Sequence, residues 1–265
     1  MIEESLLLIF VGFIAGVINV LAGGGSLLSL PVLIFLGIPP ATANGTNRIA
    51  IIIQNIFAVK GFQSRGVHTF PFSIYLAIPA TLGAIVGALM GVKIEGELFN
   101  KILGVIMVVI VGYMLFKPKD TAIQFVERTH GKPLWISVIV FFLIGVYGGL
   151  IHVGVGFMIL VSLSSINRIS LVKGNAIKVF VALVYSLVAL AIFAYHDRVN
   201  WIYGLILSLG NASGAWFASR WSVNKGDGFI KKILLIMVLV LAVNLWFPNL
   251  YSNLKSLVSE LFYGF

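Results

Sequence analysis

The sequence lacks cysteine and is poor in acidic residues. With no cysteine, the chain can form no disulfide or iron–sulfur cluster, and it has no thiol nucleophile. The 9 Asp and Glu residues all fall in predicted loops or near the termini, so we expect no carboxylate pair for hydrolysis, no carboxylate proton relay and no counter-ion for a cation. These absences predict that the chain is not an enzyme and does not carry cations.

Motifs for cofactors and nucleic acids are also missing. The 4 histidines are scattered, without HExxH or another metal-ligand spacing, and no GxxxxGK(S/T) loop is present to bind ATP. Although the net charge is +9, no basic amphipathic helix or basic–aromatic alternation concentrates it. We therefore expect no cofactor, no nucleic-acid partner and no requirement for an ATPase partner.

What the sequence has in abundance is apolar surface. Hydrophobic residues make up 60% of the chain and charged residues 10%, with a mean hydropathy of +1.07, whereas a soluble domain has about 25% charged residues. The first residues, MIEES, are acidic, unlike the basic start of a signal peptide. The composition predicts an all-α, multi-pass protein in a lipid bilayer, because helices satisfy their own backbone hydrogen bonds there.

Ten apolar segments recur along the chain, and two of them are shorter than the roughly 20 residues that span a membrane. The short ones are 26–38 and 156–166, and the segment 49–59 reaches full length only if 42–48 is already helical. Short, Gly- or Pro-interrupted segments at matching places in two halves are typical of transporter sites. The other predicted segments are 6–22, 70–91, 98–116, 134–152, 176–195, 201–219 and 230–247.

The two halves of the chain match weakly in their glycine and polar positions. The matched pairs are Gly12 with Gly145, Gly16 with Gly149, Asn19 with His152, Asn44 with Asn175, Asn47 with Lys178, Gln54 with Tyr185 and Gly83 with Gly214. Because each half holds an odd number of segments, the second half must be inverted in the membrane. We predict two inverted-topology repeats of five membrane segments each, with about eight long helices and two short or broken ones.

The distribution of basic residues predicts the orientation. We divide the chain into a first membrane repeat (1–116), a cytoplasmic linker (117–133) and a second, inverted membrane repeat (134–265). With both termini outside, most of the 18 Lys and Arg residues fall in cytoplasmic loops, as the positive-inside rule expects. Full crossings of the short segments and hairpins that return to one side fit this distribution equally well.

The stretch Ala15–Arg48 concentrates what membrane helices avoid, namely a triple glycine, three prolines and a polar cluster. Gly23, Gly24 and Gly25 would let backbone amides approach a ligand without hindrance from Cβ atoms. Ser26 is a candidate N-cap for a helix whose positive end would attract an anion. The alternative is that the glycines only allow a tight helical hairpin to pack.

Polar residues follow this break in the third segment. Asn44, Asn47 and Gln54 share one face at helical spacing, with Arg48 beside it, and the second half repeats the pattern. The residues are Asn44, Thr46, Asn47, Arg48 and Gln54 in the first half and Asn175 and Lys178 in the second. We predict that they donate hydrogen bonds to an anion. The alternatives are that the cations snorkel to the interface and that the asparagines bond between helices.

His152 ends a predicted segment, and Asn19 is its counterpart in the first half. A histidine there would carry a coupling proton, because it titrates near neutrality, or it would make a hydrogen bond between helices. Small residues at 83, 87 and 91 and at 210, 214 and 218 have the spacing of close helix contacts, within the chain or at the seam of a homodimer.

Many of these positions belong to a longer pattern of glycine and proline. In the first half the pattern comprises Gly12, Ala15, Gly16, Gly23 to Gly25, Ser26, Leu27, Pro31, Leu33, Gly37, Pro39, Ala43 and Thr46. In the second half it comprises Gly145, Gly148, Gly149, Gly154 and Gly156. With this pattern the chain resembles, over essentially its whole length, the sulfite exporter TauE/SafE family of membrane permeases.

The resemblance implies a secondary transporter of the inner membrane that exports small sulfur-containing oxyanions, such as sulfite or organosulfonates, without ATP. We expect alternating access around a midplane site between the two broken segments. An anion channel of the same architecture and a non-transport membrane enzyme or assembly factor are the alternatives. The anion, the direction of transport, the coupling ion and the oligomeric state stay open at this point.

Overall fold

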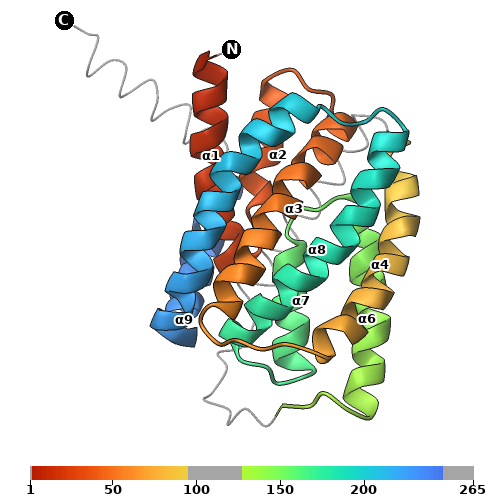
Figure 1. Ribbon diagram of the computed structural model, residues 1–265, viewed down its shortest axis with the longest axis vertical. Helices are drawn as coiled ribbons and strands as arrows, with labels where there is room; N and C mark the ends of the chain where they lie inside the picture. The colour runs from red at the N-terminus through yellow and green to blue at the C-terminus, as the bar shows by residue number, and fades with distance from the viewer. Residues whose placement is uncertain (1, 95–126, 247–265) are drawn as a thin grey trace, which may run out of the picture.

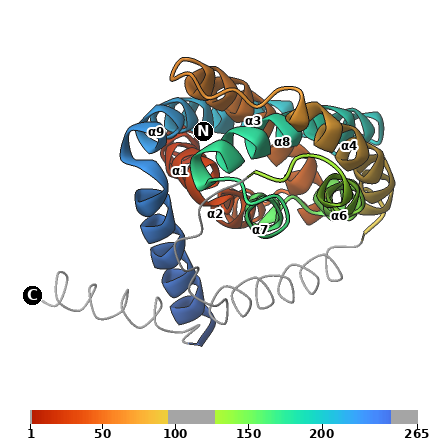
Figure 2. The same ribbon diagram turned by 90° about the horizontal axis from the view of Figure 1, so that it is seen from below.

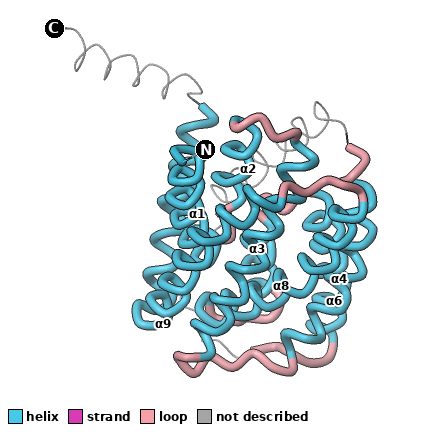
Figure 3. The backbone as a smooth tube through the Cα atoms, turned by 45° about the horizontal axis from the view of Figure 1, so that its top comes forward, coloured by secondary structure: helices cyan, strands magenta, loops and turns pink. Residues whose placement is uncertain are grey.

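The computed structural model describes residues 2–94 and 127–246, and it describes side chains as far as residue 226. Within these ranges the chain forms eight helices and no strand (Figures 1 and 3). The helices are α1 (Ile2–Ala22), α2 (Ser26–Phe35), α3 (Pro40–Gln63), α4 (Phe72–Gly91), α6 (Lys132–Leu150), α7 (Val155–Ser165), α8 (Leu171–Tyr195) and α9 (Trp201–Trp246).

The helices are long and apolar enough for a multi-pass membrane protein. By length and hydropathy, α1, α4, α6 and α8 can each cross a bilayer. The predicted segment 98–116 lies outside the described residues. The segments 201–219 and 230–247 are joined in α9, which changes direction at Gly226, where φ is 71° (Figure 2). Helix α3 starts at Pro40, so the condition for a full-length third segment, helix over 42–48, is confirmed.

The short segments form hairpins with the helices that precede them. Helix α2 has 10 residues and α7 has 11, so each rises about 15 Å, half of the roughly 30 Å hydrocarbon core. Leu8 of α1 packs in one cluster with Leu33 of α2 and Ile38 beyond it, so the chain returns toward its start. The α1–α2 hairpin enters the bundle from one end, and the α6–α7 hairpin enters from the other (Figure 1).

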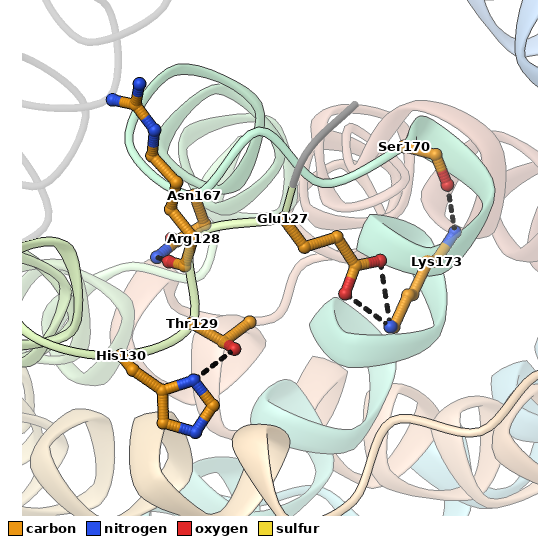
Figure 4. Close-up of polar contacts among 7 residues, drawn as sticks. All are labelled: Glu127, Arg128, Thr129, His130, Asn167, Ser170 and Lys173. Atoms are coloured by element: carbon orange, nitrogen blue, oxygen red, sulfur yellow. Dashed lines mark hydrogen bonds and ion pairs between the residues drawn. The ribbon is translucent and has the colours of Figure 1, made fainter. Parts of the chain in front are cut away.

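The base of the second hairpin is fastened by Asn167, which follows α7 and is fully buried. Asn167 exchanges hydrogen bonds with the backbone of Arg128, at 2.8 and 3.0 Å, and its side chain accepts one from Ser137 of α6 at 2.9 Å. Beside it, Lys173 of α8 forms an ion pair with Glu127 at 2.7 Å (Figure 4). The end of the predicted linker 117–133 is thus fixed to the loop between α7 and α8.

Glycines bring the long helices into close contact within the chain. A Cβ added to Gly83 of α4 would lie 2.0 Å from the carbonyl oxygen of Phe142 in α6. A Cβ added to Gly214 of α9 would lie 2.2 Å from that of Phe13 in α1. The small residues at 83, 87, 210 and 214 therefore serve helix packing inside one chain.

Candidate functional site

The two broken stretches meet where the hairpin tips touch. The chain turns through the left-handed region at Gly23, where φ is 78°, and at Gly154, where φ is 69°, a conformation that glycine adopts without strain. A Cβ added to Gly23 would lie 2.3 Å from the carbonyl carbon of Gly156. A side chain at Gly23 would collide with the backbone of the other tip, so the glycines allow the two tips to touch.

The start of α2 differs in detail from the prediction. Gly25, not Ser26, is the N-cap, and no side chain caps the helix. Ser26 is already helical, and its hydroxyl accepts a hydrogen bond from Asn47 Nδ2 at 3.1 Å. In the first turn, the amides of Leu27 and Leu28 donate to the carbonyl oxygens of Gly24 and Gly25, both at 3.0 Å, and the aligned peptide dipoles of α2 give this end a partial positive charge. The prediction that Ser26 caps α2 is therefore wrong, although Ser26 does lie beside the break.

Arg48 of α3 is fully buried at the other break. Its Nη1 donates to the carbonyl oxygen of Gly148 at 3.1 Å, and its Nη2 donates to that of Gly149, in the last turn of α6. The guanidinium lies 4.7 Å from the ring centroid of Phe193. Arg48 Nε has no hydrogen-bond partner. The side chain does not snorkel to an interface, because it is enclosed by α6 and α8.

Lys178 of α8 is the corresponding cation at the first break, with 3% of its surface exposed. Its Nζ donates to the carbonyl oxygens of Asn19 and Val20, both at 2.8 Å, in the last turn of α1. A third hydrogen bond goes to Asn175 Oδ1. Lys178 is therefore buried as well, and its three ammonium hydrogens match three acceptors.

Two asparagines complete a crossed arrangement of helix ends. Asn44 Nδ2 of α3 donates to the carbonyl oxygen of Leu150 in α6 at 2.7 Å. Asn175 Nδ2 of α8 donates to that of Leu21 in α1 at 3.4 Å. Thus α3 binds the end of α6, and α8 binds the end of α1, in each case through one cation and one asparagine one helical turn away.

The electrostatics of the two breaks favour a negative ligand. Carbonyl ends of helices carry only partial negative charge, and the described partners of Arg48 and Lys178 are all neutral oxygens. Among the residues with described side chains, no Asp or Glu is buried. A buried charge without an opposite charge is costly in a medium of low dielectric constant. Within the described side chains, no buried acidic residue therefore balances the positive charges of Arg48 and Lys178.

The remaining predicted residues of α3 contact different neighbours. Asn47 Oδ1 accepts a hydrogen bond from Ser29 of α2 at 2.7 Å, so Asn47 ties α3 to the start of α2. Thr46 accepts from the backbone of Asn200 at 2.8 Å, and Gln54 accepts from Asn211 of α9 at 3.2 Å. Asn47 thus lies beside a break, whereas Thr46 and Gln54 face α9 and make contacts between helices.

His152 lies in the break rather than in a helix. Helix α6 ends at Leu150 while α1 continues to Ala22, so the predicted pairing of His152 with Asn19 does not match the local structure. His152 Nδ1 is 2.8 Å from the hydroxyl of Tyr185 in α8. Tyr185 was predicted as the counterpart of Gln54 but not as a binding residue. Ser29 was missed, although it lies one helical turn after Ser26.

All thirteen candidates are buried, and most gather at the two breaks. Those at or beside a break are Asn19, Gly23, Gly24, Gly25, Ser26, Asn44, Asn47, Arg48, His152, Asn175 and Lys178. A groove of about 770 Å³ lies elsewhere, between α3 and α9. At the tips themselves, Gly23 and Gly156 are in direct contact.

Comparison with known proteins supplies the class of protein. A sequence profile described as Sulfite exporter TauE/SafE matches residues 8–245. A probable membrane transporter protein of a Sinorhizobium species, ORF9, is 28% identical over 233 residues, covering 88% of each chain. One from Haemophilus influenzae is 27% identical over 236 residues, covering 89% of this chain and 92% of the relative. No solved structure matches.

With its apolar helices, paired broken hairpins and relatives of matching length, the molecule is a multi-pass membrane transporter. The chain belongs to the sulfite exporter TauE/SafE family.

Proposed function

We propose that this protein is a secondary transporter that exports small sulfur-containing oxyanions, such as sulfite or an organosulfonate, across the inner membrane. The observation that carries the proposal is the pair of buried cations, Arg48 and Lys178, at two hairpin tips that touch. Neither cation has a carboxylate among its described partners. An oxyanion supplies the missing negative charge.

The oxyanion class follows from the donors near the breaks. A guanidinium presents its N–H groups in a planar fork that matches two oxygens of one oxyanion. The start of α2, behind Gly24 and Gly25, adds the partial positive charge of a helix N-terminus with no side chain in the way. This donor set suits a compact anion with several oxygens, and the family name supports sulfur as its central atom.

We further propose that the chain is built from two inverted repeats of five segments each. The first comprises α1–α4 and the predicted segment 98–116, and the second comprises α6–α8 and the two segments joined in α9. The crossed contacts of α3 with α6 and of α8 with α1 support this relation, as do hairpins that enter from opposite ends (Figure 1). By these contacts Leu21 corresponds to Leu150. This correspondence is shifted by four residues from the sequence pairing of Asn19 with His152. The positive-inside rule puts both termini outside.

The crossed contacts suggest how binding moves the protein. An oxyanion that takes donors of Arg48 competes with the carbonyls of Gly148 and Gly149. The α6–α7 tip is then free to move away from Gly23, which opens one side of the site. Lys178 holds the α1 end in the same way. The membrane potential, negative inside, drives an anion outward with about 2.3 kcal/mol per charge per 100 mV.

The proposal is tested by sulfite efflux from proteoliposomes that contain the purified protein. A carrier gives flux that saturates with concentration, and it exchanges labelled for unlabelled sulfite in counterflow. Flux without saturation or counterflow would identify an anion channel instead. No protein-dependent flux of sulfite or organosulfonates would contradict transport of this substrate class and favour an enzyme or assembly factor.

A further inference from the structure

The outer face of the bundle carries a groove that the transport site does not use. It has a volume of about 770 Å³ and runs between α3 and α9, which lie side by side (Figures 1 and 2). Its walls are Ile53, Phe57, Lys60, Leu205, Ile206, Ser208, Leu209, Ala212, Ser213 and Trp216. Several of these side chains are exposed, including Leu205, Leu209 and Trp216, so the groove opens to the surroundings of the bundle.

The walls of the groove suit a hydrocarbon chain. The hydroxyl of Ser208 donates to the carbonyl oxygen of Leu205 at 2.6 Å, and that of Ser213 donates to that of Gly210 at 2.8 Å. Both serine hydroxyls therefore donate their hydrogen bonds to carbonyl oxygens of α9 itself. The rings of Phe57 and Trp216 meet edge to face, with centroids 6.5 Å apart. Apart from Lys60, the groove therefore presents mainly apolar surface to a ligand.

One end of the groove is positively charged. Lys60, exposed in the last turn of α3, lines that end. The guanidinium of Arg220 lies 4.9 Å from the ring centroid of Trp216, and Arg220 Nε has no hydrogen-bond partner. Gly61 packs directly against Ser219, so the two cations flank the same end. No acidic residue lines the groove.

The length of the groove matches one leaflet. From Leu205 to Trp216, α9 rises about 16 Å at 1.5 Å per residue, and half of a bilayer core is about 15 Å. A tryptophan at one end is typical of the level of lipid headgroups. An acyl chain in the groove therefore ends where the cations lie.

We propose that this groove binds an anionic phospholipid, with one acyl chain between α3 and α9 and the phosphate between Lys60 and Arg220. The positive-inside rule assigns both residues to the cytoplasmic side, whose leaflet carries the anionic lipids that basic pockets between helices recognise. A second copy of the chain fits less well, because it would have to bury the Lys60 ammonium. The lipid site is independent of the transported anion.

The test is native mass spectrometry of the full-length protein with phosphatidylglycerol and phosphatidylcholine of identical acyl chains. The wild type should retain phosphatidylglycerol in preference. The preference should fall about fivefold for each cation removed, in Lys60→Gln and then in Lys60→Gln/Arg220→Gln. Lys93→Gln, which removes an exposed cation elsewhere, should change nothing. An unchanged preference in Lys60→Gln, or an equal fall in Lys93→Gln, would overturn the proposal.

A second pair of variants tests the groove itself. Ser213→Phe fills it and should abolish retention of both lipids, while gel filtration verifies the fold. Because the chain has no cysteine, Ser213→Cys gives a single thiol for crosslinking in native membranes. Little crosslinking with a bifunctional maleimide supports a lipid-filled groove. Near-complete crosslinked dimers would show a seam between two copies and overturn the proposal.

Discussion

The two hairpin tips have the same design, but their cations are satisfied to different degrees. All three ammonium hydrogens of Lys178 have acceptors, two carbonyl oxygens and Asn175 Oδ1. Arg48 has five N–H donors, yet it bonds two carbonyls and leaves Nε without a partner. Asn44 Oδ1 is unpartnered as well. The Arg48 end therefore has spare hydrogen-bonding capacity for a ligand, whereas the Lys178 end is a completed structural contact.

The largest effect is expected from Arg48→Gln, which removes the cation with spare donors. Losing one member of a buried, hydrogen-bonded charge pair costs about 2–5 kcal/mol, so sulfite efflux from proteoliposomes should fall at least about 30-fold. Arg48→Lys keeps the charge but loses the planar fork, and it should recover only part of the flux. The exposed Lys93→Gln is the control for loss of charge alone.

Lys178→Gln tests whether the two tips differ, because it should lower the stability of the fold more than it lowers the affinity for sulfite. Its carbonyl partners at Asn19 and Val20 lose a charged donor, which should lower the free energy of unfolding by about 2–3 kcal/mol. A thermal-shift assay measures this loss, and sulfite binding to the folded fraction should weaken only a few fold. A loss of binding as large as that of Arg48→Gln would make the two tips equivalent.

Gly23→Ala tests the contact between the tips. An added Cβ would meet Gly156 at 2.3 Å, and φ is 78°, so overpacking and backbone strain should cost about 1–3 kcal/mol. Gly37→Ala is a matched control, because φ is 85° there and nothing lies within 4 Å of the added Cβ. Equal losses of thermal stability in both variants would mean that tip contact contributes nothing.

The smallest effect is expected from Tyr185→Phe. The change removes one hydrogen bond, to His152 Nδ1, which should cost about 1 kcal/mol of unfolding free energy. Sulfite efflux and its pH dependence should stay close to those of the wild type, because the membrane potential acting on the charge of sulfite drives transport, and no proton carried by His152 is needed. A shifted pH profile in Tyr185→Phe would instead make His152 part of proton coupling.

The helical pattern and the neighbourhood of the site follow from local features of the sequence. Apolar length separates the full helices from the two short ones, and the glycines locate both breaks. Arg48 and Lys178 stand out because cations inside apolar segments are rare and need partners. The sequence left the length of α3 open, because the polar residues Asn44 to Arg48 are compatible with a loop as well as with a helix. The structure puts Pro40 in the first helical turn, where proline is favoured, so these residues are helical.

The identity of the partners could not be predicted, because it depends on tertiary contacts. Nothing local indicates that Arg48 binds the end of α6 while Lys178 binds the end of α1. The cap at Gly25 rather than Ser26 reflects a competing hydrogen bond from Asn47. Asn167 was missed because its partners, Arg128 and Ser137, lie 39 and 30 residues away.

The central claim is that Arg48, at the less satisfied tip, binds the oxyanion. Isothermal titration calorimetry with sulfite, on purified wild type, Arg48→Gln and Lys178→Gln, tests it most directly. We predict that the wild type binds sulfite, that Lys178→Gln binds it a few fold more weakly, and that folded Arg48→Gln shows no measurable binding. Wild-type affinity in an Arg48→Gln protein that elutes normally in gel filtration would contradict the account.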